Sequence, residues 1–100
     1  MKIEEQGDTL LISEVSELGA ATSNSFRDHV RSAFGPAHKN IQIDLSQTTF
    51  IDSCGLGALI ALHKAACGRN GTVRLVNPQP SVNQILELTR MHQIFQIAKN

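Results

Sequence analysis

An acid and an alcohol stand side by side at Asp52 and Ser53, immediately before an apolar stretch with the spacing of a helix. The first backbone N–H groups of a helix have no partner inside the helix, so this position attracts hydroxyl oxygens and negative charge. One interpretation is a plain N-terminal cap, which stabilises a helix by about 1 kcal/mol. The other is a regulatory site, because a phosphate on Ser53 would add a charge of about −1.5 to −2 at the helix end.

Two glycines, Gly55 and Gly57, follow in the first turn of the same predicted helix. Because they carry no side chains, another backbone can approach the helix end closely. Cys54 lies between the serine and the first glycine, where a thiol can become reactive. A small buried residue is the simpler interpretation of Cys54.

A metal site is a further interpretation, because His63 and Cys67 are four residues apart on the predicted helix. That spacing can place two ligands on one metal ion, yet it is also the spacing of a helix face packed against a core. No pattern such as C-x-x-C or H-x-x-x-H supplies the further ligands. We therefore expect no metal and no other cofactor.

Hydrolytic catalysis would need a nucleophile, a base and an acid in one site. Ser53, the four histidines and either Asp52 or Asp44 supply the residue types of a Ser–His–Asp triad. The sequence has no G-x-S-x-G elbow, however, and 100 residues leave little room for a substrate pocket. We therefore predict that the protein is not an enzyme.

Other hydroxyl groups near Ser53 are weaker phosphorylation candidates. Ser46 follows a predicted strand, where a serine is expected to make a local turn bond. Thr48 and Thr49 lie in the same loop and are ranked with it.

Composition places further limits on function. The chain has 100 residues, of which 41% are hydrophobic, and its nine basic and nine acidic residues give a formal net charge of zero. This is the composition of one folded domain, which we expect to span residues 1–100. Balanced charge argues against electrostatic binding to nucleic acid and against a polybasic membrane anchor.

The sequence predicts a cytoplasmic location. No apolar run approaches the ~20 residues of a membrane span. The N-terminus, MKIEEQGD, carries acids where a signal peptide needs an apolar stretch. Two cysteines do not make a disulfide framework, which fits a reducing compartment.

The elements that must position these residues alternate between strand and helix patterns. We predict strands over 1–6, 9–15, 41–45, 72–76 and 95–97, and helices over 21–34, 55–67 and 82–89, the last capped by Ser81. The first two strands meet at Gly7-Asp8 and form a hairpin. Strands separated by helices pair in parallel with right-handed crossovers. The expected fold is therefore α/β, a small mixed sheet with an N-terminal hairpin at its edge and helices mainly on one face.

Each of the first two helices is expected to bury one face. Residues at positions i, i+3, i+4 and i+7 of a helix share a face. In the first helix these are Phe26, His29, Val30 and Ala33, and in the second they are Leu56, Leu59, Ile60, His63 and Cys67, with Leu62 and Ala66 widening the face.

Residues 44–57, DLSQTTFIDSCGLG, resemble the signature of the STAS domain, in particular that of the bacterial anti-sigma factor antagonists. That signature has a strand followed by D-L-S, a spacer, an apolar pair, and then D-S-x-G-L-G before an apolar helix. Here these positions are Asp44-Leu45-Ser46, Phe50-Ile51 and residues 52–57. The predicted order of elements is also similar to the family's fold along essentially the whole chain, so the resemblance implies a STAS fold.

In that family, the serine that matches Ser53 is phosphorylated by a cognate anti-sigma factor with serine-kinase activity. The unphosphorylated form binds the kinase and so releases a sigma factor or another client, and a PP2C-type phosphatase removes the phosphate. The resemblance therefore implies an anti-sigma factor antagonist that acts by partner switching and catalyses nothing. It also implies that Asp52 orients the acceptor hydroxyl or contacts the kinase. The partner-binding residues that it implies are Asp52, Ser53, Cys54, Gly55, Leu56 and Gly57.

Two positions depart from the family pattern. Cys54 stands where a second serine is common, which leaves Ser53 as the acceptor hydroxyl in the motif. Gly19, in the stretch 18–22, stands where the family often carries an acid near the phosphorylation site. The second departure bears on phosphorylation and on the choice of kinase, and not on the fold.

Two other functions fit the same motif. A STAS accessory subunit of a membrane lipid-transport ATPase would dock the same helix end on the ATPase, without phosphorylation of Ser53. A STAS switch can also control a non-sigma client, such as a biofilm or secretion regulator. The identity of the partner separates these functions, and the sequence does not contain it.

Overall fold

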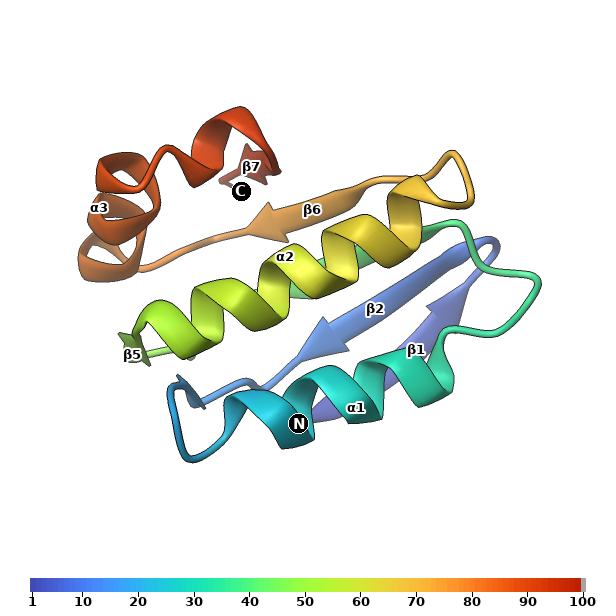
Figure 1. Ribbon diagram of the computed structural model, residues 1–100, viewed down its shortest axis with the longest axis horizontal. Coiled ribbons are helices and arrows are strands. Elements are labelled where there is room, and N and C mark those ends of the chain that lie inside the picture. The colour runs from blue at the N-terminus through green and yellow to red at the C-terminus, as the bar shows by residue number, and fades with distance from the viewer. Residues whose placement is uncertain (100) are drawn as a thin grey trace.

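The structure, a computed structural model, describes residues 1–99, and the predicted domain ends one residue later, at Asn100, which lies outside the described residues. The strands are β1 Lys2–Gln6, β2 Thr9–Ser13, β3 Glu17–Leu18, β4 Asn40–Asp44, β5 Phe50–Ile51, β6 Val73–Val76 and β7 Gln96–Ala98. The helices are α1 Ser23–Ala33, α2 Ser53–Cys67 and α3 Pro80–Leu88, with the short 3-10 helix η1 at Met91–Gln93. Figure 1 shows α1 and α2 lying side by side in front of the strands.

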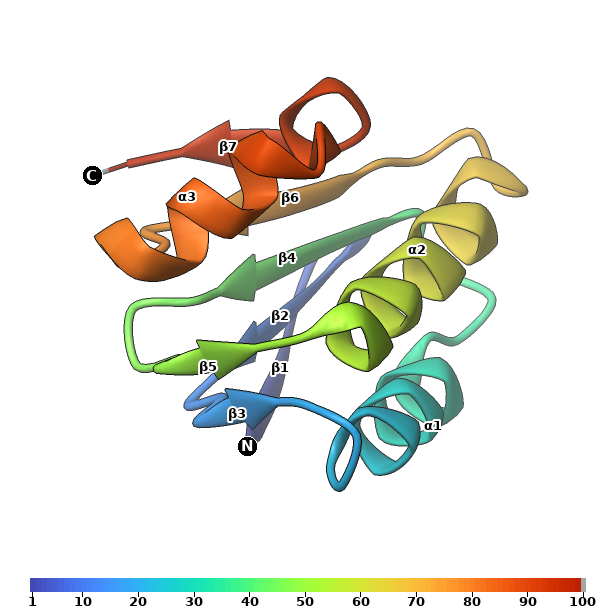
Figure 2. The same ribbon diagram turned by 60° about the vertical axis from the view of Figure 1, so that its left-hand side comes forward.

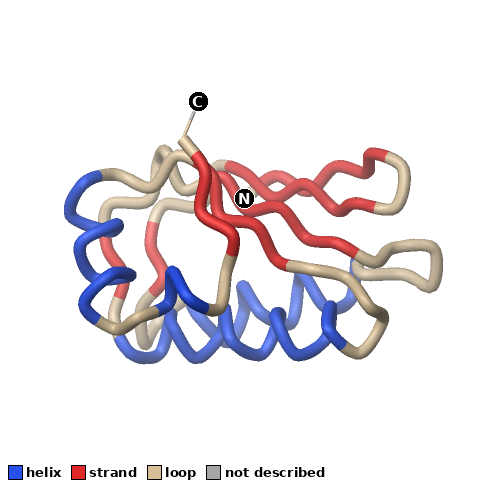
Figure 3. Tube along the Cα trace, turned by 90° about the horizontal axis from the view of Figure 1, so that it is seen from above, coloured by secondary structure: helices blue, strands red, loops and turns tan. Residues whose placement is uncertain are grey.

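A five-stranded mixed sheet forms the centre of the molecule, in the order β1-β2-β4-β6-β7. β1 and β2 pair antiparallel, and the other neighbours pair in parallel. Gly7 makes the hairpin turn with a φ of 61°, a conformation that glycine adopts without strain. Figure 3 shows α1 and α2 along one side of the sheet and α3 at one end. The predicted α/β fold, with an N-terminal hairpin and helices mainly on one face, is confirmed.

The face of the sheet toward α1 and α2 is apolar because every second strand residue points to it. Its central residues are at most 1% exposed; they are Leu10, Ile12, Ile41, Ile43 and Leu75. The residues between them point to the opposite face, where Leu11 stands among polar residues such as Gln42 and Arg74. Alternation of this kind is what predicted the strands, and here it separates the core from an open polar face.

All three helices begin at residues other than those predicted, and α1 begins at Ser23 instead of residue 21. α2 begins at Ser53 instead of residue 55, because Asp52 caps it. α3 begins at Pro80, with Gln79 before it, so Ser81 lies inside the helix and the prediction of Ser81 as its cap is wrong. Proline suits the first helical position because its ring fixes the helical φ and because an N–H there would have no partner.

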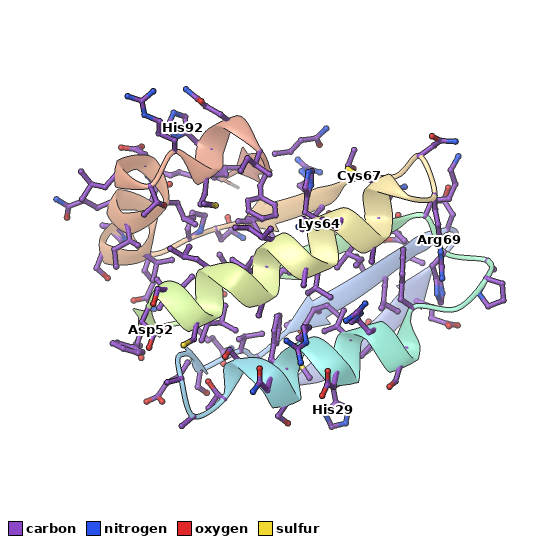
Figure 4. All side chains as sticks on the ribbon, in the orientation of Figure 1. His29, Asp52, Lys64, Cys67, Arg69 and His92 are labelled. Carbon is purple, nitrogen blue, oxygen red and sulfur yellow. The ribbon has the colours of Figure 1, made fainter. Side chains whose placement is uncertain are left out.

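Five positions that were expected in the core are not fully buried. Cys67 and His29 are exposed, and Ala33, Ile60 and His63 are only partly buried; Figure 4 shows His29 pointing away from the molecule. α2 packs against both the sheet and α1, so two neighbours decide which of its residues are enclosed. The residues of α2 with no exposed surface are Leu59, Leu62 and Ala66.

Two short strands and η1 were not predicted. β3 and β5 pair in parallel as a separate two-stranded sheet, with Glu17 opposite Phe50 and Leu18 opposite Ile51. Two residues in a strand give no alternation that a sequence pattern can detect. Figure 2 shows this small sheet running directly into the N-terminal end of α2. The missed strands therefore hold the start of the helix that carries Ser53.

The C-terminal end of α2 is closed by Arg69. Its guanidinium lies 4.0 Å from the centre of the Phe34 ring and donates hydrogen bonds to the carbonyl oxygens of Phe34, Gly35 and His38. The His38 ring is buried, and its Nδ1 accepts a hydrogen bond from the Gly35 N–H at 2.9 Å. Its Nε2 lies 3.1 Å from the Glu5 carboxylate. These contacts fasten the loop between α1 and β4 to the end of α2.

Candidate functional site

The N-terminus of α2 is capped by one carboxylate. Oδ1 of Asp52 accepts hydrogen bonds from the N–H of Cys54 at 2.9 Å and from that of Gly55 at 3.1 Å. Ser53 is the first residue of the helix and is exposed. The cap interpretation therefore holds for Asp52, and the hydroxyl of Ser53 is not needed for capping.

The same carboxylate also joins α2 to the segment that precedes α1. Oδ2 of Asp52 accepts a hydrogen bond from the Ala20 N–H at 3.1 Å, and the Asp52 N–H donates to the Leu18 carbonyl at 3.1 Å. Three backbone N–H groups thus bind one side chain that is only half-buried. Hydrogen bonds to a charged acceptor are stronger than neutral ones, so this network fixes the direction of the helix start.

Gly55 and Gly57 differ in what surrounds them. A Cβ atom at Gly55 would overlap the Leu18 carbonyl, so only glycine lets the helix start approach β3 this closely. A Cβ atom at Gly57 would have no neighbour within 4 Å. Glycine inside a helix costs about 0.5–1 kcal/mol relative to alanine. Packing inside the chain therefore explains Gly55 and does not explain Gly57.

The six residues implied as a partner-binding surface are not equally accessible. Ser53, Cys54 and Gly57 are exposed, Asp52 is half-buried, and Gly55 and Leu56 are buried. Direct contact with a partner is open to the exposed residues, while Gly55 and Leu56 position them. The interpretation of Cys54 as a buried residue is wrong, because its side chain projects from the first turn into solvent.

Phe50 lies beside this helix end and was not singled out from the sequence. Its side chain is half exposed, and its ring fills the space next to Gly19: a Cβ atom at Gly19 would lie 2.7 Å from Cε2 of Phe50 and 3.2 Å from Oδ2 of Asp52. The ring thus stands next to the position where the resemblance expects an acid. Because β5 has only two residues and both are apolar, no alternation in the sequence distinguishes the exposed Phe50 from the buried Ile51.

The other hydroxyl groups of the loop take part in local structure. Ser46 is exposed, and its backbone N–H, rather than its hydroxyl, makes the turn bond, to Asp44 Oδ1 at 2.9 Å. Thr48 is fully buried and donates to the Val15 carbonyl at 2.6 Å. Thr49 is exposed and donates to the Ser16 carbonyl at 3.4 Å. Of these hydroxyl groups, only that of Thr48 is enclosed by the chain.

His63 and Cys67 meet on α2, with Sγ of Cys67 3.5 Å from Nε2 of His63. The His63 ring also packs edge-on against Phe95. Within residues 1–99, no group of three or more His, Cys, Asp or Glu side chains gathers as a metal site would require. No helix in the same range is long and apolar enough to cross a membrane.

Charge is distributed unequally along α2, although the chain is neutral. Segments 14–26 and 44–63, which build the end with Ser53, contain acids but no lysine or arginine; the acids are Glu14, Glu17, Asp44 and Asp52. Segments 29–43 and 64–75 contain bases but no acid; the bases are Arg31, Lys39, Lys64, Arg69 and Arg74. Glu5 and Asp8 of the hairpin also lie at this end, against His38 and Asn40, so the end carries an excess of bases. Figure 4 shows Asp52 and Arg69 at opposite ends of the helix.

Comparison with known proteins matches essentially the whole chain to one domain family. The model of the STAS domain matches residues 1–100. A STAS-domain-containing protein of Pseudomonas aeruginosa is 32% identical over 93 residues, which are 92% of this chain and 90% of that protein. A protein of Thermotoga maritima that is named as an anti-sigma factor antagonist is 28% identical over 91 residues, which are 90% of this chain and 80% of that protein.

Solved structures share the fold at lower sequence identity. The crystal structure of a Thermotoga maritima protein that is named as an anti-sigma factor antagonist has a TM-score of 0.87 at 23% identity, covering 99% of this chain and 86% of that one. The unphosphorylated anti-sigma factor antagonist SpoIIAA has a TM-score of 0.83 at 22% identity, covering 97% and 86%. The murine anion transporter Slc26a9 has a TM-score of 0.78 at 22% identity, covering 94% of this chain and 16% of the transporter. These similarities establish the fold.

Proposed function

The chain belongs to the STAS domain family, and from this premise we propose that it is an anti-sigma factor antagonist controlled by phosphorylation of Ser53. Its partner is an anti-sigma factor with serine-kinase activity, which binds the unphosphorylated form. The whole chain, residues 1–100, acts as one STAS domain in the cytoplasm, without a cofactor and without binding nucleic acid. The observation that carries the proposal is the exposed Ser53 at the first position of α2, next to a cap made by another residue.

The surroundings of Ser53 suit a phosphoryl acceptor. The hydroxyl is accessible, and Asp52 is held by three N–H groups, so the helix start does not depend on Ser53. The kinase would transfer the γ-phosphoryl group of ATP to Oγ of Ser53, with loss of the hydroxyl proton and release of ADP. A PP2C-type phosphatase would return the hydroxyl by hydrolysis. This chain catalyses neither step.

Phosphorylation would change the surface without unfolding the chain. A phosphate at a helix N-terminus is stabilised by the helix dipole. The same phosphate would stand next to the Asp52 carboxylate, at the acidic end of the molecule. A docked partner would have to desolvate this added charge, and the phosphates of nucleotide bound to the kinase would repel it. The kinase therefore releases the phosphorylated form.

Phosphate mapping tests this proposal. The purified chain is incubated with ATP and the kinase-fold protein encoded beside its gene, and phosphate is located by mass spectrometry. We expect label on Ser53 and none in Ser53→Ala, while the control variants Ser46→Ala and Thr49→Ala keep the label because their hydroxyl groups lie elsewhere in the loop. Label that persists in Ser53→Ala, or no label on the wild-type chain, would contradict the proposal.

A second candidate is a subunit of a membrane transporter, such as a lipid-transport ATPase. It is favoured by one observation, which is that the same fold forms 16% of the chain of the murine transporter Slc26a9. In that case α2 would dock on the transporter, and Ser53→Ala would leave assembly intact. Co-purification of the tagged chain with a transporter rather than a kinase would select this candidate. Co-purification with a kinase whose client is a biofilm or secretion regulator would support phosphorylation-controlled partner switching, but with a client other than a sigma factor.

A further inference from the structure

Phe50 is the one phenylalanine that the fold leaves open to solvent. The chain has four phenylalanines, and Phe26, Phe34 and Phe95 are 5%, 7% and 3% exposed. Phe50 is 50% exposed. Aromatic side chains contribute large apolar areas to interfaces, and single exposed aromatics beside a functional site are typical binding anchors.

The ring of Phe50 has a defined position next to the phosphorylation site. β5 holds its backbone against β3, where Glu17 is the residue directly opposite. One edge of the ring lies against Gly19, and Asp52, two residues along the chain, is the cap next to Ser53. Leu18 and Ile51, the other pair of this small sheet, are buried, so Phe50 and Glu17 share its outer face.

Acids outnumber bases around Phe50, where Lys2, opposite Ser13 and beside Glu14, is a base. Segments 14–26 and 44–63 carry four acids and no lysine or arginine. Glu17 also lines a groove of about 710 Å³ together with Glu14, Val15 and Phe26, so acidic and apolar groups continue away from the ring. A partner that covers this surface must therefore supply positive charge together with a flat or apolar group.

We propose that Phe50 is the aromatic anchor of the partner interface and that it receives a guanidinium group of the partner, which pairs with Glu17. Arginine fits better than lysine because its planar group stacks on an aromatic face while it donates hydrogen bonds to a carboxylate. The inference rests on the proposed function for the identity of the partner, a kinase-type anti-sigma factor. It adds Phe50 and Glu17 to the surface formed by Ser53, Cys54 and Gly57.

A cationic partner group is compatible with release on phosphorylation. In the complex, Glu17 pairs with the guanidinium and neutralises its charge. The guanidinium therefore stabilises a phosphate on Ser53 only weakly. The phosphate would remain a desolvated dianion at the edge of the interface, which is unfavourable. Attraction holds the unphosphorylated complex, and the cost of desolvation opposes the phosphorylated one.

Photo-crosslinking in the native host tests the surface and the proposed function separately. The photoreactive residue p-benzoylphenylalanine replaces Phe50, Cys54 or, as a control, Leu88, which is 76% exposed on α3. We expect positions 50 and 54, but not 88, to crosslink to a kinase-fold protein, at a site within side-chain reach of an arginine. Crosslinks from 54 but not 50 would overturn the inference and leave the proposed function standing. Crosslinks from 50 to an arginine-bearing surface of another class of protein would support the inference and overturn the proposed function.

Affinity measurements with the purified crosslinked partner give the energetic test. Phe50→Ala should weaken binding about tenfold or more, Phe50→Tyr should restore it, and the matched control Leu88→Ala should leave it unchanged. Glu17→Gln should reduce the dependence of the affinity on salt, because it removes one charge pair. Equal affinities for Phe50→Ala and Leu88→Ala would refute the anchor, and an unchanged salt dependence in Glu17→Gln would refute the guanidinium pair. Thermal unfolding of each variant shows that the fold is retained.

Discussion

The two ends of α2 handle their polar groups in opposite ways. At the C-terminal end, Arg69 and His38 bind partners within the chain, and the Phe34 ring is covered by the guanidinium. At the N-terminal end, Ser53 is exposed and the Phe50 ring is half open to solvent. The first end is built to hold the chain together. The second uses one carboxylate, that of Asp52, for the same purpose and leaves its other groups accessible.

Glycine shows the same contrast on a smaller scale. Gly71, after the C-terminal end, faces the Lys39 carbonyl, and Gly55 faces the Leu18 carbonyl, so neither can carry a side chain. Gly57 faces open space. Gly55 and Gly71 thus allow close contacts inside the chain, whereas Gly57 leaves part of the surface open. Variants at both ends of α2 test this difference between the two ends.

The largest effect is expected for Gly55→Ala. The new methyl group would overlap the Leu18 carbonyl, so β3 or the start of α2 must move. We expect a loss of about 3 kcal/mol in the free energy of unfolding, measured by denaturant titration. The matched control is Gly57→Ala in the same helix. Equal stabilities of the two variants would show that the close approach at Gly55 is not required.

Arg69→Ala should destabilise the chain by about 1–3 kcal/mol, because it removes hydrogen bonds to three carbonyl oxygens and the contact with Phe34. The affinity for the partner should not change, since Arg69 lies at the far end of α2. Arg74→Ala is the control, because Arg74 is exposed on the open face of the sheet. A weaker complex with Arg69→Ala in a fully folded sample would argue against the division between the two ends.

Asp52→Ala should cost about 1 kcal/mol through loss of the cap. It should also speed hydrogen exchange at the Ala20 amide, which donates to the lost carboxylate. Asp52→Asn keeps an acceptor oxygen and should recover most of the stability. If Ala20 exchanges at the wild-type rate in Asp52→Ala, the link between the helix start and the segment before α1 is not maintained in solution.

The smallest change in stability, and of opposite sign, is expected for Gly57→Ala. The free energy of unfolding should rise by about 0.5–1 kcal/mol, because alanine is the better helix former and the methyl group meets no neighbour. Binding to the partner should weaken, since the methyl group projects into the proposed interface. A variant that is more stable and binds as well as wild type would show that no partner approaches this position.

The sequence predicts the parts of the molecule that have a repeating pattern. Alternation in residues 41–45 and helical spacing in 55–67 predict β4 and α2, and the D-S-x-G-L-G motif predicts the family. The two-residue strands β3 and β5 have no period, so the element that orients the helix start could not be predicted. Helical spacing predicts that Cys67 and Ala66 are both buried, but Cys67 is exposed, because the enclosed residues of α2 depend also on α1, which is far away in the sequence. Phosphorylation of Ser53 remains a prediction.

The separation of charge along α2 has a consequence for how the molecule meets a partner. A neutral protein is not pulled as a whole toward a charged surface, but one with an excess of acids at one end and an excess of bases at the other is rotated by its field. Association is usually limited by the rare encounters in which two patches face each other. A torque that turns the acidic end toward a basic partner raises the fraction of encounters in which the two patches face each other. The chain can therefore bind quickly without the non-specific attraction that a large net charge brings.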